Sequence, residues 1–315
     1  MKDKLNIIYA GTPSFAVPSL EVLVKADFFV SHVLTQPDKR AGRGMKIIQS
    51  PVKQKALELN IPVLQPESLI DDLIYEKIKK INPDIFVVAA YGLIIPQKIL
   101  DLFRCDALNI HASLLPRWRG AAPIHRAIQW GDNEIGITIM KIIKQLDAGP
   151  MIRKSSIRND NLTTGAATEM LAKLGANLMK EVIRDLENKK SLIYEEQDES
   201  FATYAEKITK QEARLNLDDS AQQVIQKINA FNPFPGVYSY FRGKLFKIWR
   251  AKKVSIKDQK NKFGYLFVDD KKLYLGLKNE TIEIEEIQIE GKSKMTAIEF
   301  IDGYKIVQQE LILNE

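Results

Sequence analysis

Short apolar runs alternate with segments of helical spacing through the first half of the chain. Turn-forming or polar residues bound each run, and this pattern predicts buried strands. Four strands are predicted in this way, at residues 5–9, 28–34, 85–90 and 107–110. Helical spacing is found at 17–25, 52–59, 69–81 and 163–186. Because alternating strands and helices are typical of α/β domains, we predict a Rossmann-like, open and mostly parallel sheet.

The pattern changes after residue 190. Residues 195–200 are polar and have no apolar period, which indicates a linker. A helix at 217–230 and a turn at 231–236 precede five short predicted strands, at 237–241, 245–251, 265–268, 273–277 and 281–289. The last strand loses its alternation at Glu285 and Glu286, which indicates a bulge. We expect a first domain at 1–190, a linker at 191–208 and a smaller OB-like β-barrel domain at 209–315.

Composition narrows the class of protein. Hydrophobic residues make up 45% and charged residues 27%, which is ordinary for a water-soluble globular chain. No apolar run approaches the roughly 18–20 residues that cross a bilayer, and the first residues do not resemble a signal peptide. Cys105 is the single cysteine, so no internal disulfide and no Cys-rich zinc module is expected. We therefore predict a cytoplasmic protein without a metal. We also predict a monomer, since no extended apolar stripe marks an interface between subunits.

The ends of the predicted strands are where ligands bind in open α/β sheets. A dinucleotide fold would carry G-x-G-x-x-G after its first strand, but only Gly11 of that motif is present, which disfavours a nicotinamide or flavin cofactor. Tyr91 and His111 each follow an apolar strand. For Tyr91, a packed loop aromatic and a ligand contact remain equal alternatives.

Asn109 and His111 are separated by one residue, so strand alternation turns both toward one side of the sheet. An Asn amide can stabilise an oxyanion, and an imidazole can relay a proton or hold a tetrahedral intermediate. Transfer of an acyl or formyl group to an amine needs both stabilisation of the oxyanion and transfer of a proton. A carboxylate such as Asp147 could favour the charged form of the imidazole. From the residues alone, a structural role for this pair stays open.

A longer string surrounds this pair. Asn109 and His111 lead into the segment 113–124, SLLPRWRGAAPI, and Leu146–Asp147 follows later. This set resembles the signature of the 10-formyltetrahydrofolate formyltransferases. The segments 10–13, 89–92 and 230–236 are most similar to the branch that formylates methionyl-tRNA. Ala148 and Pro150 stand where relatives often have Thr and Asp, and His125 where Gln is common; we expect His125 to be a surface or packed residue.

The resemblance implies roles for individual residues. It makes Asn109, His111 and Asp147 the catalytic residues, and it implies 10-formyltetrahydrofolate as the co-substrate that donates the formyl group. The acceptor implied is the α-amino group of charged initiator tRNA. The implied folate site is formed by Ser113, Leu114, Leu115, Pro116 and Tyr91.

Basic residues mark two candidate tRNA contacts. The net charge of +6 permits a nucleic-acid partner, but clustering matters more. Lys39, Arg40, Arg43 and Lys46 are interleaved with glycines in a loop predicted to be flexible. The resemblance implies that this loop contacts the acceptor arm. In the second domain, Lys244, Lys247 and Arg250 belong to a basic run, whereas the last strand is rich in Glu. We therefore expect separate basic and acidic regions there, with the tRNA backbone on the basic one.

Two rival functions remain at this point. A formyltransferase for a small amine, such as an amino sugar nucleotide, would share the three catalytic residues but would not need the basic loop. A non-enzymatic RNA-binding protein would leave the segment from Asn109 to Pro123 unexplained.

Overall fold

A computed structural model describes residues 4–41, 45–254, 262–306 and 309–311. The chain forms two compact units, each assembled from separate stretches of sequence. The first comprises Met1–Pro123, Ile135–Ile157 and Thr168–Ala205, and the second comprises Ile124–Glu134, Arg158–Ala167 and Glu206–Glu315. The predicted boundaries at 190 and 209 stay a prediction. None of the described helices is long and apolar enough to span a membrane.

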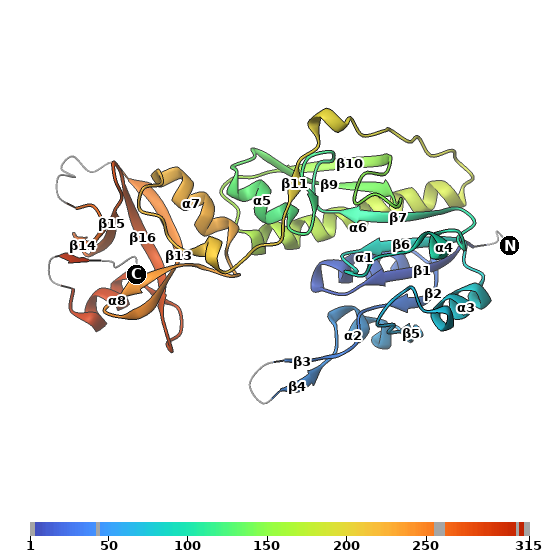
Figure 1. Ribbon diagram of the computed structural model, residues 1–315, viewed down its shortest axis with the longest axis horizontal. Coiled ribbons are helices and arrows are strands. Elements are labelled where there is room, and N and C mark those ends of the chain that lie inside the picture. Colours follow the sequence, from blue (N-terminus) through green and yellow to red (C-terminus); the bar gives the residue numbers. More distant parts are fainter. Residues whose placement is uncertain (1–3, 42–44, 255–261, 307–308, 312–315) are drawn as a thin grey trace. The chain divides into compact units, whose positions relative to one another are not determined.

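The first unit is built on a seven-stranded sheet in the order β10-β9-β7-β6-β1-β2-β5 (Figure 1). Its strands are β1 (Asn6–Gly11), β2 (Phe29–Leu34), β5 (Val63–Leu64), β6 (Ile85–Ala89), β7 (Asp106–His111), β9 (Glu134–Lys141) and β10 (Met151–Arg158). Neighbours from β7 to β5 run parallel, as predicted, and β9 is antiparallel to β7. The prediction did not contain β5, β9 or β10, although Ile135, Ile137 and Ile139 alternate as in a strand.

Helices connect these strands. They are η1 (Ser14–Ala16), α1 (Val17–Lys25), α2 (Pro51–Glu58), α3 (Asp72–Ile81), α4 (Gln97–Leu100) and α6 (Thr164–Glu187). The helix α5 (Pro123–Gln129) also lies between two of these strands in the sequence, but from Ile124 on it belongs to the second unit. In α3, the side chain of Asp71 caps the first turn by accepting from the Leu73 amide. Ile74 and Ile78, one turn apart, are buried in the core cluster that includes Phe86 of β6. Capping and one apolar stripe therefore explain this helix.

The carboxyl ends of β1 and β6 meet where the strand order reverses. Gly11 pairs with Ala89 across these strands. A Cβ at Gly11 would lie 2.7 Å from the Cβ of Ala16 and 3.0 Å from the carbonyl oxygen of Ala89. Only glycine permits this close approach of β1 to Ala16 and Ala89. The point at which the strand order reverses is the usual place for a ligand in an open α/β sheet.

The basic loop of the first unit is a hairpin. β3 (Lys39–Ala41) pairs antiparallel with β4 (Lys46–Ile48), and Figure 1 shows the two strands projecting beyond α2. The prediction of a flexible loop is therefore wrong for the residues of these two strands, 39–41 and 46–48. Gly42, Arg43 and Gly44 lie outside the described residues.

The second unit holds a sheet in the order β12-β13-β16-β15-β14-β18, with β17 paired to β16. Its elements are η3 (Gln211–Ala213), α7 (Ala221–Ala230), β12 (Val237–Phe241), β13 (Lys244–Val254), β14 (Tyr265–Asp269), β15 (Lys272–Gly276), β16 (Thr281–Ile289), β17 (Met295–Thr296), α8 (Ala297–Tyr304) and β18 (Gln309–Leu311). The pairings between these neighbouring strands are antiparallel. The five predicted strands are confirmed. The bulge is confirmed too, because Glu286 pairs with Arg250 and Ile284 with Ala251, which leaves Glu285 between them.

An aromatic cluster forms part of this unit's core. Phe300 of α8 is fully buried, with its ring centroid 5.2 Å from that of Phe241 and 5.8 Å from that of Phe246. We expect Phe300→Ala to lower the free energy of unfolding by about 3–5 kcal/mol, because it removes a large buried ring and leaves a cavity. Urea denaturation would measure the change. Ile298→Ala is the matched control, since Ile298 lies on the same helix and is 56% exposed; equal losses in both variants would contradict this packing account.

Candidate active site

Asn109 and His111 lie at the carboxyl end of β7, inside the sheet of the first unit. Asn109 pairs with Val88 of β6 and His111 with Thr138 of β9. His111 is buried and Asn109 is half-buried. Among the described residues, none forms a hydrogen bond with the side-chain amide of Asn109. The strand therefore presents one buried imidazole and one unengaged amide from alternate positions of a single strand.

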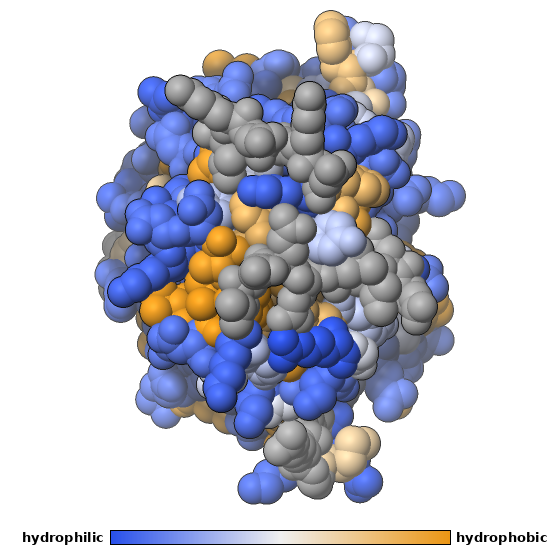
Figure 2. Space-filling view, turned by 90° about the vertical axis from the view of Figure 1, so that its left-hand side faces the viewer, coloured by the Kyte–Doolittle hydropathy of each residue, from blue (hydrophilic) through white to orange (hydrophobic). Residues whose placement is uncertain are grey.

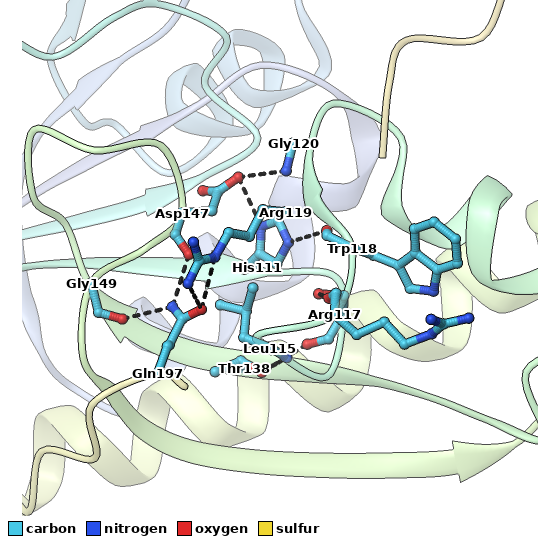
Figure 3. A network of polar contacts seen from close by, with 11 residues as sticks. His111, Leu115, Arg117, Trp118, Arg119, Gly120, Thr138, Asp147, Gly149 and Gln197 are labelled. Atoms are coloured by element: carbon cyan, nitrogen blue, oxygen red, sulfur yellow. Dashed lines mark hydrogen bonds and ion pairs between the residues drawn. The ribbon is translucent and has the colours of Figure 1, made fainter. Parts of the chain in front are cut away.

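The His111 ring is held between two groups of the protein (Figure 3). Its Nε2 lies 2.9 Å from the carbonyl oxygen of Trp118. A carbonyl only accepts hydrogen bonds, so Nε2 carries a hydrogen and donates it. Nδ1 lies 3.6 Å from Oδ2 of Asp147, which is too long for a direct hydrogen bond but close enough for an ion pair. The structure thus places Asp147 next to the imidazole, a contact that the sequence alone left open.

Asp147 reaches this position through an unusual backbone conformation. Its φ is 48°, in the left-handed region that residues with a Cβ rarely adopt. Its Oδ2 accepts a hydrogen bond of 2.9 Å from the Gly120 amide. The same oxygen therefore faces both the Gly120 amide and the His111 ring.

A buried polar network supports the Asp147 turn, and the sequence did not predict it. Gln197 donates from Nε2 to the carbonyl oxygens of Asp147 and Gly149, each at 2.8 Å. Its Oε1 accepts from Nε and Nη2 of Arg119, at 3.0 and 2.9 Å. Arg119 is fully buried and also pairs with the carboxylate of Glu199 at 2.8 Å. Figure 3 shows Arg119 and Gln197 beside the Asp147 turn.

Gln197 and Glu199 come from the segment 191–208, which we expected to be a linker. β11 (Tyr204–Ala205) pairs with β8 (Arg119–Gly120), and η2 (Glu199–Phe201) precedes it. Glu195 forms a bridge with Met151 of β10. The polar composition of residues 195–200 indicated a linker, but polar side chains can also bind a neighbouring loop. No periodic signal in the segment distinguishes the two cases.

Two hydrogen bonds with Thr138 hold the loop 113–116 in place. The Thr138 hydroxyl donates to the carbonyl oxygen of Ser113 at 2.7 Å and accepts from the Leu115 amide at 3.1 Å. Leu115 packs against Met140 and Met151, and Leu114 and Pro116 are partly buried. The Ser113 hydroxyl donates to the carbonyl oxygen of Arg117. This loop has a defined backbone beside His111, and its predicted contacts with folate stay a prediction.

Tyr91 is a packed aromatic. Its ring belongs to the core cluster with Phe86 and Ile99, and burial raises the pKa of its phenol. Its carbonyl oxygen accepts from the Thr12 hydroxyl at 2.8 Å and from the Gln36 amide at 3.1 Å. A contact between Tyr91 and folate stays a prediction.

The predicted cationic residues differ in their surroundings. Lys39, Arg40 and Lys46 of the hairpin are exposed, as is Lys244. Lys247 donates to the carbonyl oxygen of Pro235 at 2.7 Å, and burial lowers the pKa of its ammonium group. Arg43 lies outside the described residues.

The expected separation of charge in the second unit is wrong. β13 and β16 are neighbours, and their antiparallel register places basic residues opposite acidic ones. Arg250 lies 3.3 Å from Glu285, and Lys252 lies 3.0 Å from Glu283. Lys253 lies 2.6 Å from Glu280. Cross-strand pairing thus neutralises much of the basic run, which a one-dimensional charge count could not reveal.

No group of three or more His, Cys, Asp or Glu side chains that could hold a metal ion occurs in the part of the chain that the structure describes. His125 is partly buried, and burial lowers the pKa of its ring, as expected for a packed histidine.

Comparison with known proteins points to one family. The family model described as formyl transferase matches residues 3–183, and that of the formyl transferase C-terminal domain matches residues 207–305. The methionyl-tRNA formyltransferase of Coxiella burnetii is 44% identical over 95% of this chain and 96% of its own length. That of Methylobacillus flagellatus is also 44% identical, with the same coverage. HypX from Aquifex aeolicus, solved with tetrahydrofolic acid, has a TM-score of 0.63 at 16% identity, covering 96% of this chain and 48% of its own. This last match concerns the fold alone.

Thr138 offers a test of how the loop beside His111 is held. Thr138 is fully buried, and its hydroxyl is the partner of both the Leu115 amide and the Ser113 carbonyl. We expect Thr138→Val to lower the free energy of unfolding by about 1–3 kcal/mol, because it leaves buried backbone groups unpaired without changing the side-chain shape. Urea denaturation would measure this. Thr138→Ser keeps the hydroxyl and serves as the control, and a Val variant as stable as the Ser variant would refute the account.

Proposed function

The chain belongs to the formyl transferase family, and on that premise we propose that it formylates the α-amino group of methionyl-initiator tRNA, with 10-formyltetrahydrofolate as the donor, for translation initiation. The observation that carries this proposal is the full-length similarity: relatives named methionyl-tRNA formyltransferase match 95% of the chain at 44% identity. The reaction is a one-carbon group transfer. The amine lone pair attacks the formyl carbon, the bond from that carbon to N10 of the folate breaks, and the proton lost by the amine balances the charge on N10.

Asn109 and His111 are proposed to stabilise the oxyanion that forms during this attack. The unengaged amide of Asn109 can donate to the formyl oxygen. Nε2 of His111 is occupied by the Trp118 carbonyl, so Nδ1 is the ring nitrogen that can donate to a reacting group. Donors held in place before reaction are worth most in a buried site, where water does not compete.

Asp147 is proposed to orient His111 and to help move the proton. Its carboxylate faces Nδ1 at 3.6 Å, a distance that lets a reacting oxygen share the Nδ1 hydrogen. Since the Gly120 amide also binds Oδ2, the carboxylate keeps its orientation when the proton moves.

The folate is proposed to lie along the loop formed by Ser113, Leu114, Leu115 and Pro116, next to Tyr91. The support is the fixed backbone of this loop beside His111, together with its place at the carboxyl ends of the parallel strands.

The proposal also covers the domain organisation, the oligomeric state and the location of the protein. We infer that residues 209–315 form an OB-like barrel, preceded by a catalytic domain at 1–190 and a connection at 191–208. The antiparallel sheet of the second unit supports the barrel. We also propose a cytoplasmic monomer, consistent with a bacterial-type translation enzyme.

The tRNA is proposed to contact two basic surfaces. The first is the hairpin with Lys39, Arg40, Arg43 and Lys46, whose described cations are exposed. The second is the region of Lys244, Lys247 and Arg250 in β13. Figure 2 shows one face of the molecule, on which most of the coloured residues are hydrophilic and surround a smaller hydrophobic patch. Contacts with a phosphate backbone are expected to be wet and salt-sensitive.

One assay separates this function from its rivals. The protein is incubated with 10-formyltetrahydrofolate and either charged initiator tRNA or an amino sugar nucleotide. Formylation of the tRNA alone is the expected result. Formylation of the sugar nucleotide alone would favour the small-amine enzyme, and binding of tRNA without formyl transfer would favour the RNA-binding protein.

His111→Ala tests the proposed chemistry. We expect kcat to fall roughly 10²–10⁴-fold, as for a positioned acid–base group, while KM for tRNA stays within about twofold. The readout is formylation of charged initiator tRNA under steady-state conditions. His32→Gln is the control, because it changes the histidine of β2 in the same sheet. A loss of less than about tenfold in His111→Ala would remove the residue from the mechanism.

Neutralising Lys244, Lys247 and Arg250 together tests the second basic surface. We expect KM for tRNA to rise on the order of 10-fold with little change in kcat, because the lost contacts are to phosphates. The slope of log KM against log salt should fall by about 1 for each lost contact. The control joins Lys252→Ala with Lys253→Ala, two lysines already paired with Glu283 and Glu280. An unchanged KM in the triple variant would exclude this docking role.

A further inference from the structure

The buried side chain of Gln197 makes contacts that a passive connection between domains does not require. It is 8% exposed, and both its oxygen and its nitrogen are engaged. One amide nitrogen donates to two carbonyl oxygens, those of Asp147 and Gly149, at 2.8 Å each. Both hydrogens of the NH₂ group are thereby used on one turn.

The orientation of this amide is dictated by Arg119. A guanidinium only donates, so the Gln197 oxygen must face Arg119 and the nitrogen must face the turn. Arg119 in turn is fixed by its ion pair with Glu199 and by the pairing of β8 with β11. The amide therefore has one arrangement in which every polar atom is satisfied.

The turn that Gln197 binds needs external support. Asp147 has a φ of 48°, and such a backbone persists only where surrounding contacts hold it. At Gly149, a Cβ would lie 1.9 Å from the carbonyl oxygen of Lys141, so the chain is also tightly confined there. Two hydrogen bonds from one side chain to carbonyls on either side of Ala148 restrict rotation of this turn.

The consequence reaches His111 through Asp147. The Asp147 backbone is held by Gln197, its carboxylate is held by Gly120, and the carboxylate faces the imidazole. We propose that Gln197, oriented by Arg119, is a positioning residue that keeps the Asp147 carboxylate aligned with His111 during formyl transfer. The proposal deepens the proposed function and rests on it. It gives the segment 195–201 a part in the active site.

A double-mutant cycle tests this role in the full-length protein. Gln197→Glu keeps an oxygen for Arg119 but replaces the donor to the two carbonyls with a second acceptor. We expect kcat to fall about 10- to 100-fold, as for a misplacement of about 1 Å, with KM for folate and for tRNA within about twofold. In an Asp147→Asn background, the same change should cost less than about threefold, because its effect is transmitted by Asp147. Glu196→Gln is the matched control, since Glu196 is the exposed neighbour.

The outcomes separate the two proposals. Equal losses from Gln197→Glu in both backgrounds would overturn the positioning role, as would a kcat unchanged in the wild-type background. Gln197→Leu provides a second variant whose folding is followed by thermal unfolding, and a loss of kcat in a variant as stable as Glu196→Gln supports the role. If wild-type protein formylates only an amino sugar nucleotide, the tRNA function fails, and the cycle is then measured with that amine.

Discussion

A fully buried guanidinium organises the first unit around the candidate active site. The charge of Arg119 must be compensated where water cannot reach it, and the described chain supplies Glu199 and Gln197 for this purpose. Both partners lie about 80 residues later in the sequence, at separations of 80 and 78. Because Arg119 binds Glu199 and Gln197, the polar segment that carries them packs against the loop after β7. The amide of Gln197 in this segment binds the Asp147 turn.

The loop after β7 has a second support, from the sheet itself. Thr138 of β9 binds the loop at Ser113 and Leu115, while the strand pairing with β11 binds it at Arg119. The residues between these anchor points include Trp118, whose carbonyl fixes the His111 ring. Orientation of the imidazole thus follows from hydrogen bonds on both sides of the loop, which is what a preorganised oxyanion site requires.

The sequence predicted those parts of the site that depend on local pattern. The continuous apolar runs identified β1, β6 and β7, and alternation along β7 placed Asn109 and His111 on one side. The network of Gln197 could not be predicted, because a polar residue without periodicity has no local preference for a distant carbonyl. The pairing of Lys252 with Glu283 was likewise hidden, since register between β13 and β16 is set by long-range strand pairing.

This pairing changes which cations can attract a phosphate backbone. A lysine that already faces a carboxylate releases little free energy on meeting a phosphate, because the new contact replaces an old one and both are screened by salt. In the described part of the second unit, Arg250, Lys252 and Lys253 already face carboxylates, whereas Lys244 is exposed and enters no ion pair. Net charge along the chain therefore overstates the attraction that β13 can exert. Recognition of a polyanion falls more heavily on exposed cations without acidic neighbours, and Arg40 and Lys46 of the first unit's hairpin meet that condition among the described residues.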